Sequence, residues 1–177
     1  MEAPAASSFS SRDLRDALGH FATGVAVVTA RNQDGDPIGM TMSSFNAVSL
    51  HPPLVLFSVA RTAHSLEAMQ NARGFAVNIL GHAQAELSQR FARPLADKWQ
   101  AVAHSPGFGD APILDDVLAH FECGPYAQYD GGDHVIFVCQ VHRFATAGGG
   151  EGPLIFYRGR YHTLADEAER NRDAENR

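Results

Sequence analysis

The chain has 177 residues, 45% of them hydrophobic, which is the size of one globular domain with a substantial core. Its formal net charge is −6 and its basic residues are scattered, so neither a nucleic acid nor an anionic membrane is an expected partner. Sixteen Gly, nine Pro and eleven Phe favour an architecture rich in strands and turns over a helical bundle.

The expected domain organisation is simple. Residues 1–11 are predicted to be a disordered arm, residues 12–164 the domain, and residues 165–177 a charged tail. The N-terminal sequence lacks the features of a secretion signal, and no apolar run approaches the roughly 18 residues of a membrane span. We therefore expect a cytoplasmic protein in which Cys123 and Cys139 are reduced, buried thiols.

The predicted elements are mostly short strands. Ser10 or Ser11 can cap a first helix, Gly74 can end a second, and residues 94–112 look irregular. In chain order we expect a helix up to about Phe21, strands over 25–31, 38–50 (with interruptions) and 54–59, a helix over 62–73, a strand over 75–80, a helix over 83–92, and strands over 117–123, 134–145 and 153–158. Because these helices are not regular crossovers between strands, an antiparallel barrel is favoured over a doubly wound sheet.

The sequence lacks the motifs of several common catalytic and ligand-binding sites. There is no G-x-G-x-x-G between a strand and a helix, no P-loop and no G-x-S-x-G elbow. The nine His residues lack the H-E-x-x-H spacing, so no metal site is expected. Cys123 lies in an apolar alternating run, where a thiol is usually part of the core rather than a nucleophile.

The most informative stretch is Gly39-Met40-Thr41-Met42-Ser43-Ser44-Phe45-Asn46. It combines hydroxyls, an amide and small residues between two predicted strands. A flavin needs such a mixture, because its pyrimidine edge and phosphate take polar donors while its ring rests on apolar groups. The alternative is a polar strand edge whose hydroxyls face water.

Two further segments could contact an anionic ligand. Arg61 precedes the predicted second helix, with Thr62 and Ser65 in its first turn, and such a helix start can hold a phosphate. The alternative is that Thr62 caps the helix and Arg61 is solvated. Gly131-Gly132-Asp133-His134 is a glycine turn that delivers His134 to the start of a strand, either as a substrate contact or as an incidental residue of a hairpin.

Six segments together resemble the flavin reductase family, the short-chain reductase components of two-component flavin monooxygenases. They occur in the family's order over roughly residues 12–164. These segments are Phe21-Ala22-Thr23-Gly24-Val25, Gly39 to Phe45, Val48 to Val55, Phe75 to Leu80, Gly132-Asp133-His134, and Pro153-Leu154 followed by Gly159-Arg160-Tyr161.

The resemblance implies a mainly β fold, a split β-barrel with a Greek-key core and a few short helices. It implies FMN or FAD bound near the interface of a homodimer, and NADH or NADPH as hydride donor. Reduced flavin is expected to diffuse to a separate oxygenase. The implied flavin contacts are Gly39, Met40, Thr41, Ser43, Ser44, Asn46, Ser58, Val59, Ala60, Arg61, Ser65, Phe91 and Lys98.

For the nicotinamide dinucleotide, the resemblance implies His134 and Tyr161 as contacts, and His134 positions the substrate rather than carrying a proton. The sequence departs from the family where His51 replaces a common acid, where Trp99 replaces a Phe, and where Gly124-Pro125 interrupts the strand after Cys123.

Two rival functions remain open from the sequence. The first is a non-catalytic split-barrel protein that binds flavin or a haem-like ligand. The second is an oxidase that resembles the pyridoxamine-phosphate oxidases. His134 and Tyr161 count against the first rival, because a mere binder needs no nicotinamide site, and the scarcity of basic residues counts against the second.

Overall fold

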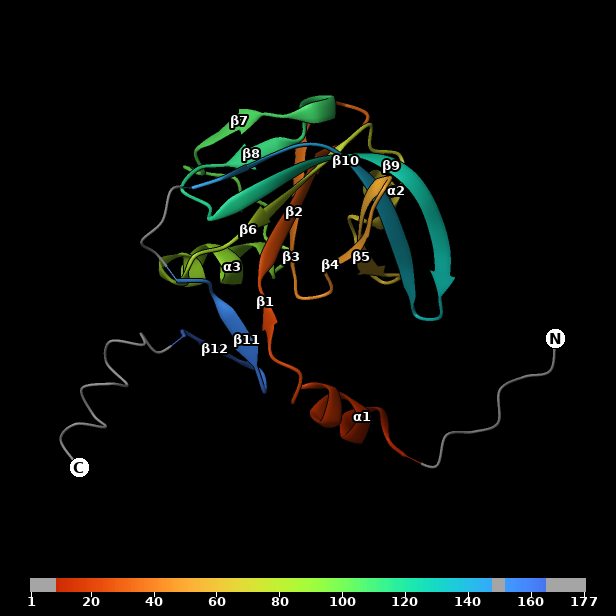
Figure 1. Ribbon diagram of the computed structural model, residues 1–177, viewed down its shortest axis with the longest axis vertical. Coiled ribbons are helices and arrows are strands. Elements are labelled where there is room, and N and C mark those ends of the chain that lie inside the picture. Colours follow the sequence, from red (N-terminus) through yellow and green to blue (C-terminus); the bar gives the residue numbers. More distant parts are fainter. Residues whose placement is uncertain (1–8, 148–151, 165–177) are drawn as a thin grey trace.

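The computed structural model describes residues 9–147 and 152–164 (Figure 1). Most of the predicted arm and all of the predicted tail lie outside these residues, while Ser11 already belongs to the first helix. The elements are α1 (Ser11–Leu18), β1 (Thr23–Gly24), β2 (Ala26–Arg31), β3 (Pro37–Met42), β4 (Asn46–Leu50), β5 (Pro53–Ala60), α2 (Leu66–Gln70), β6 (Phe75–Ile79), η1 (His82–Gln84), α3 (Ala85–Phe91), β7 (His104–Pro106), η2 (Phe108–Asp110), β8 (Pro112–Leu114), β9 (Ala119–Gly131), β10 (His134–Thr146), β11 (Ile155–Tyr157) and β12 (Arg160–His162).

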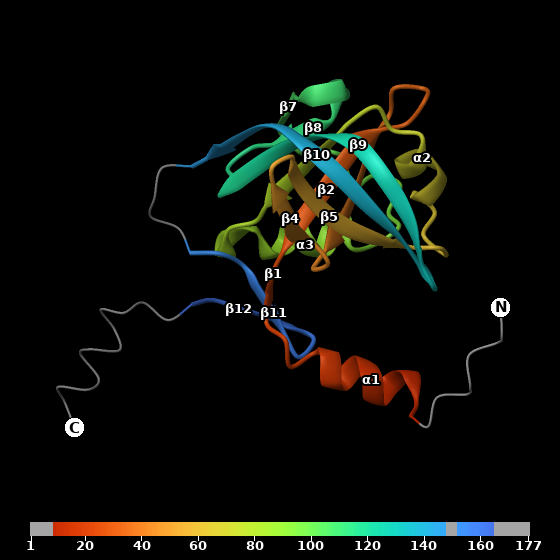
Figure 2. The same cartoon turned by 45° about the vertical axis from the view of Figure 1, so that its right-hand side comes forward.

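Seven antiparallel strands form the main sheet, in the order β3-β2-β6-β9-β10-β5-β4. The pairs β2–β6 and β5–β10 join strands far apart in sequence, as in a Greek key. Figures 1 and 2 show the sheet curling over a central core, with the long β9–β10 hairpin extending to one side. The predicted mainly β, split-barrel class is confirmed. No helix in the described part of the chain is long and apolar enough to cross a membrane.

The larger core lies inside the curled sheet. Alternate residues of β10 point into it, because side chains of a strand alternate between its two faces. Phe57, Phe75 and Phe137 are fully buried there and pack ring against ring, with centroids 5.2 to 6.0 Å apart. Met40 of the edge strand β3 packs against the same core as Val59 of β5, so residues near both ends of the sheet share one interior. Cys123 and Cys139 are free and buried, as predicted.

A second core covers the other face of β2. Val25 and Val27 meet Phe91 of α3 and Leu154, and residues of β8, β11 and β12 complete the cluster. Strand β2 is therefore buried on both faces, which explains its run of apolar residues Ala26, Val27 and Val28. Between the two cores, the buried Asn78 side chain accepts a hydrogen bond from the Leu114 N–H and donates to the Val27 carbonyl.

The first helix is as predicted at its start and differs at its end. Ser10 caps α1 and exchanges hydrogen bonds with Asp13 in a capping box. The helix ends at Leu18, so Phe21 lies beyond it. In both views α1 stands away from the barrel, and its apolar residues Leu14 and Leu18 are exposed.

The predicted helix over 62–73 is wrong in extent, since α2 covers only Leu66–Gln70. The N–H groups of Ala63 and Leu66 bond back three residues in tight turns instead of starting a longer helix. At the other end, the Asn71 side chain donates to the Glu67 carbonyl and closes the helix. Thr62 therefore caps no helix.

The expected break at Gly124-Pro125 is also wrong, because β9 runs on to Gly131. The register shifts around Tyr126, which has no partner on β10 and forms a bulge. Beyond Cys123 strand β9 pairs only with β10, so a proline that lacks an N–H is tolerated there. Residues 94–112, expected to be irregular, contain β7 and η2 and lead into β8.

Candidate functional site

The backbone of β3 lies directly against an aromatic pair. A Cβ atom added at Gly39 would come within 2.8 Å of the Phe91 ring and 3.1 Å of the Trp99 ring. These two rings pack edge to face with centroids 4.9 Å apart. The Lys98 ammonium donates a 3.1 Å hydrogen bond to the Gly39 carbonyl, and partial burial lowers the pKa of Lys98. Gly39 is thus brought together with three residues of the 91–99 segment.

A hollow of about 460 Å³ opens beside this arrangement. Its lining includes Met40, Ser65, Phe91 and Lys98, all of them predicted flavin contacts, together with residues 92–96. The volume falls in the range of small-molecule sites, and the lining combines apolar groups with the cations of Arg93 and Lys98, the His64 ring and the Ser65 hydroxyl. That chemistry suits a largely apolar ring with a polar edge.

A second hollow, of about 930 Å³, lies between α1 and the barrel. Ser43 and Ser44 line it from the loop after β3, and Phe156 and Arg158 line it from β11 and the turn that follows. The predicted flavin residues therefore face two hollows, with Met40 at one and Ser43 and Ser44 at the other. Sequence reasoning missed Arg158, because a single arginine next to a turn carries no recognisable pattern.

Two of the predicted hydroxyl groups, those of Thr41 and Ser44, are bonded to the protein itself. The Thr41 hydroxyl donates a 2.6 Å hydrogen bond to the Ser88 carbonyl. The Ser44 hydroxyl accepts from the Ser58 N–H at 3.0 Å and donates to the Ser58 carbonyl at 3.3 Å. The two hydrogen bonds between Ser44 and Ser58 join the segment 39–46 to the end of β5. The sequence had indicated these two stretches separately.

Ser88 is a second residue that sequence reasoning missed. It is fully buried in α3, and its hydroxyl lies 2.7 Å from the hydroxyl of Tyr161 on β12. Through its carbonyl and its side chain, Ser88 connects Thr41 with Tyr161. A serine within a helical segment gives no signal in the sequence, since only the tertiary fold brings β12 to this helix.

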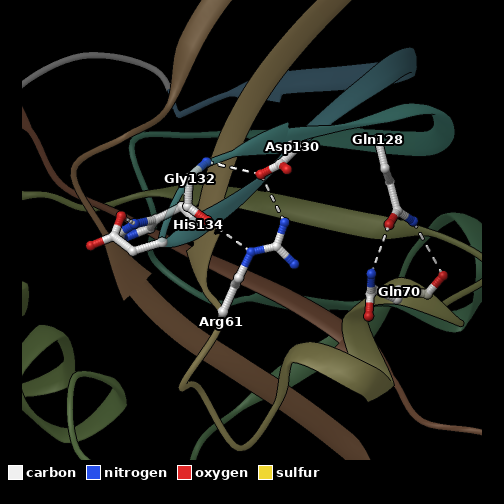
Figure 3. Close-up of polar contacts among 7 residues, drawn as sticks. Arg61, Gln70, Gln128, Asp130, Gly132 and His134 are labelled. Atoms are coloured by element: carbon white, nitrogen blue, oxygen red, sulfur yellow. Dashed lines mark hydrogen bonds and ion pairs between the residues drawn. The ribbon is translucent and has the colours of Figure 1, made fainter. Parts of the chain in front are cut away.

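Arg61 is bonded to the turn between β9 and β10 (Figure 3). Its Nε donates to the Gly132 carbonyl at 2.8 Å, and its Nη2 donates to Asp130 at 2.9 Å. Its own N–H donates to the Asp133 carbonyl. The hydrogen bond from Arg61, followed by that from the Gly132 N–H and by the charge of Arg61, lowers the pKa of Asp130. Arg61 therefore does not stand at a helix start, and although its side chain is exposed, it is bonded to the turn between β9 and β10.

His134 begins β10 opposite Ala60, and its Nδ1 donates a 2.7 Å hydrogen bond to Asp133. This hydrogen bond, with the adjacent charge of His134 as the second cause, lowers the pKa of Asp133. In Figures 1 and 2 the tip of the β9–β10 hairpin, where β10 begins, and β12, which contains Tyr161, lie on different sides of the molecule.

The remaining predicted residues differ in accessibility. Val59 points into the larger core, leaving only its main chain to meet a ligand, whereas Asn46 is exposed at the start of β4 and Ala60 is half-buried. Residues 9–147 and 152–164 contain no group of three His, Cys, Asp or Glu side chains able to hold a metal ion.

Comparison with known proteins gives concordant matches. Residues 18–165 match the family described as Flavin reductase like domain. The chain is similar to a protein of Rhizobium meliloti (strain 1021) named "Probable flavin reductase", with 45% identity over 155 residues. It is also similar to the reductase component of the flavin-dependent trigonelline monooxygenase of Acinetobacter baylyi (strain ATCC 33305 / BD413 / ADP1), with 43% identity over 154 residues.

These two alignments cover 88% and 87% of this chain but 49% of each relative, so the chain spans about half their length. A solved structure of the NADH:FAD oxidoreductase SgcE6 of Streptomyces globisporus C-1027, in complex with NAD and FAD fragments, is similar with a TM-score of 0.83 and 34% identity. That match covers 92% of this chain and 99% of the other.

Proposed function

The chain belongs to the flavin reductase family, and from this premise we propose that it is an NAD(P)H-dependent flavin reductase that reduces FMN or FAD. The observation that carries the proposal is the hollow beside β3, where Met40, Phe91 and Lys98 combine an apolar wall with a cation. The near-complete overlap with an NADH:FAD oxidoreductase supports it, because this domain alone accounts for almost that whole enzyme.

We propose that the flavin ring lies along β3 and the loop after it. There, Ser43 and Ser44 can offer hydroxyl groups, and the main chain of β3 can bond the polar edge of the ring. Lys98 holds a fixed direction through its bond to the Gly39 carbonyl, which prepares its remaining N–H groups for an anionic part of the ligand. Gly39 lets the aromatic pair approach β3 closely, since a side chain there would push Phe91 away.

The nicotinamide dinucleotide is the proposed partner of His134 and Tyr161, which would contact different parts of this long molecule. When bound, the two cofactors supply the hydride donor and the hydride acceptor. The protein needs only to stack the rings closely and exclude water, so no residue is assigned as an obligate proton carrier. His134 is a positioning residue in this scheme.

We further propose a homodimer that serves a separate oxygenase in the cytoplasm by releasing reduced flavin. The exposed apolar residues of α1, Leu14 and Leu18, support a self-association surface on this side of the barrel. The similarity to a monooxygenase reductase component supports the oxygenase partner. Two free, buried cysteines agree with a reducing compartment.

The decisive experiment follows the oxidation of NADH and NADPH by the purified protein, with FMN, FAD or riboflavin added in turn. The proposal predicts catalytic oxidation that depends on added flavin, and flavin that separates from the protein on gel filtration. Flavin binding without oxidation of either nucleotide would instead indicate a non-catalytic binding protein. His134→Ala is expected to raise the KM for NADH more than it weakens flavin binding.

A further inference from the structure

The tip of the β9–β10 hairpin is held by one exposed carboxylate. Asp130, with 78% of its side chain exposed, accepts two hydrogen bonds on the same oxygen. One comes from Nη2 of Arg61 at 2.9 Å, and the other comes from the Gly132 N–H at 2.9 Å (Figure 3). Asp130 therefore bonds both to its own turn and to a neighbouring strand end.

Arg61 completes the connection from the other side. It donates through Nε to the Gly132 carbonyl and through its main chain to the Asp133 carbonyl. One arginine at the end of β5 thus contacts three residues of the turn. Gly132 has φ 76°, a left-handed conformation that favours glycine, so the turn itself is sharply defined.

His134 follows this turn directly, and its ring is oriented by Asp133. The hydrogen bond to Asp133 occupies Nδ1 and leaves Nε2 as the ring atom that can meet a ligand. Because Arg61 holds the Asp133 backbone, the direction of the imidazole depends on the same contacts that hold the turn.

Exposed ion pairs add little to the stability of a protein, because water screens them and two flexible side chains must be ordered. The pair formed by Arg61 and Asp130 is exposed, with 47% and 78% of the two side chains accessible. Its effect is therefore expected in the geometry of the turn rather than in folding. A ligand contact on such a turn is sensitive to small displacements.

We propose that Asp130 is a positioning residue for the nicotinamide dinucleotide, acting through Arg61 and the 130–133 turn to fix the imidazole of His134. The inference rests on the proposed function, in which His134 contacts that substrate. It also gives Arg61 a role in substrate geometry that does not require it to bind the flavin phosphate.

The same hairpin provides a matched control. Gln128, two residues before Asp130 on β9, exchanges hydrogen bonds with Gln70 of α2, and both side chains are exposed (Figure 3). Gln128→Ala removes a comparable surface contact from the same strand without touching the turn. The KM for NADH of this variant is expected to equal that of the unaltered protein.

The test compares Asp130→Ala, Asp130→Asn and Gln128→Ala in steady-state kinetics with saturating flavin. Asp130→Ala should raise the KM for NADH roughly three- to tenfold, the effect of one or two lost hydrogen bonds, with kcat little changed. Asp130→Asn retains an acceptor for the Gly132 N–H and should show a smaller rise. In a His134→Ala background, Asp130→Ala should add nothing, because the residue through which it acts is gone.

An unchanged KM in Asp130→Ala, or a further rise in the His134→Ala background, would overturn the inference. The NMR signals of the His134 ring, identified by their loss in His134→Ala, give a readout that needs no activity. They should shift in Asp130→Ala and stay in place in Gln128→Ala, and unshifted signals in Asp130→Ala would also overturn it. Failure of the unaltered protein to oxidise NADH or NADPH with any flavin would refute the proposed function instead.

Discussion

Ser88 offers a direct test of how the site is held together. Ser88→Ala removes the hydroxyl that lies 2.7 Å from the Tyr161 hydroxyl. The substitution keeps the Ser88 carbonyl, which accepts from the Thr41 hydroxyl at 2.6 Å and from the Ala92 N–H at 3.0 Å. It therefore separates the contact with β12 from the contact with β3.

The size of the effect follows from burial on the two sides of this hydrogen bond. Ser88 is fully buried, whereas Tyr161 is half-buried and can turn towards water. The loss should be close to that of an ordinary hydrogen bond, about 1 kcal/mol, rather than the larger penalty of an orphaned polar group. Alanine favours a helix by up to about 0.5 kcal/mol over serine, which offsets part of the loss. We expect a net destabilisation of about 0.5–1 kcal/mol.

The assay is denaturant unfolding at one fixed protein concentration, so that the concentration dependence of any self-association is the same for all variants. Ser105→Ala, at an exposed position of β7, is the control and should leave the unfolding free energy unchanged. A double-mutant cycle with Tyr161→Phe gives the decisive comparison, because two partners of one hydrogen bond lose it only once. If the losses of Ser88→Ala and Tyr161→Phe simply add in the double variant, the two hydroxyls are not partners.

Three further predictions test other parts of the fold and the site. Asn78→Ala leaves the buried Leu114 N–H without its acceptor, so the free energy of unfolding in denaturant titrations should fall by about 2–4 kcal/mol. A loss below about 1 kcal/mol would contradict this role of Asn78. Gly39→Ala should push the Phe91 ring aside, weakening flavin binding in a fluorescence titration, and unchanged affinity would show that β3 can shift instead. Burial, followed by the charge of Glu122, raises the pKa of Cys123 to about 12, so roughly one thiol in ten thousand is ionised at about pH 8. Both cysteines should resist alkylation until the protein is unfolded, and rapid labelling of the native protein would refute their burial.

The strands were predictable because burial on a sheet leaves a clear periodic pattern. Along β10, Val135, Phe137 and Cys139 are buried while the residues between them are half-buried, and this alternation is visible in the sequence. The first helix was predictable from its cap at Ser10 for a similarly local reason. Both signals are made by neighbours along the chain.

The errors arose where tertiary contacts override local preference. The segment 62–73 has helical spacing at Leu66 and Met69, yet the turns before Leu66 bond back on themselves and keep α2 short. Gly124-Pro125 normally ends a strand, but the missing neighbour on one side of β9 removes the penalty. Neither circumstance can be read from the residues themselves.

For the candidate site, the sequence indicated which residues could contact a flavin, but it did not indicate their hydrogen-bond partners within the protein. From composition alone, the segment 39–46, the segment around Arg61 and the turn before His134 could each be an ordinary structural feature. The family resemblance was needed to assign all three to one site. The contact between Ser44 and Ser58 supports joining two of them. The partners Ser88 and Asp130 remained hidden, because each acts only through residues brought near by the fold.

These internal partners have a consequence for how tightly a flavin can be held. Thr41, Ser44 and Lys98 already bond protein carbonyls, so a ligand must use their remaining lone pairs and N–H groups or displace an existing bond. Exchanging one hydrogen bond for another contributes little net free energy, about 0.5–1.5 kcal/mol even when favourable. Because they already have partners, these three side chains keep their positions without the ligand and add little to its affinity. These three contacts therefore suit a flavin that is bound, reduced and released, because none of them gains a strong new hydrogen bond when the flavin binds.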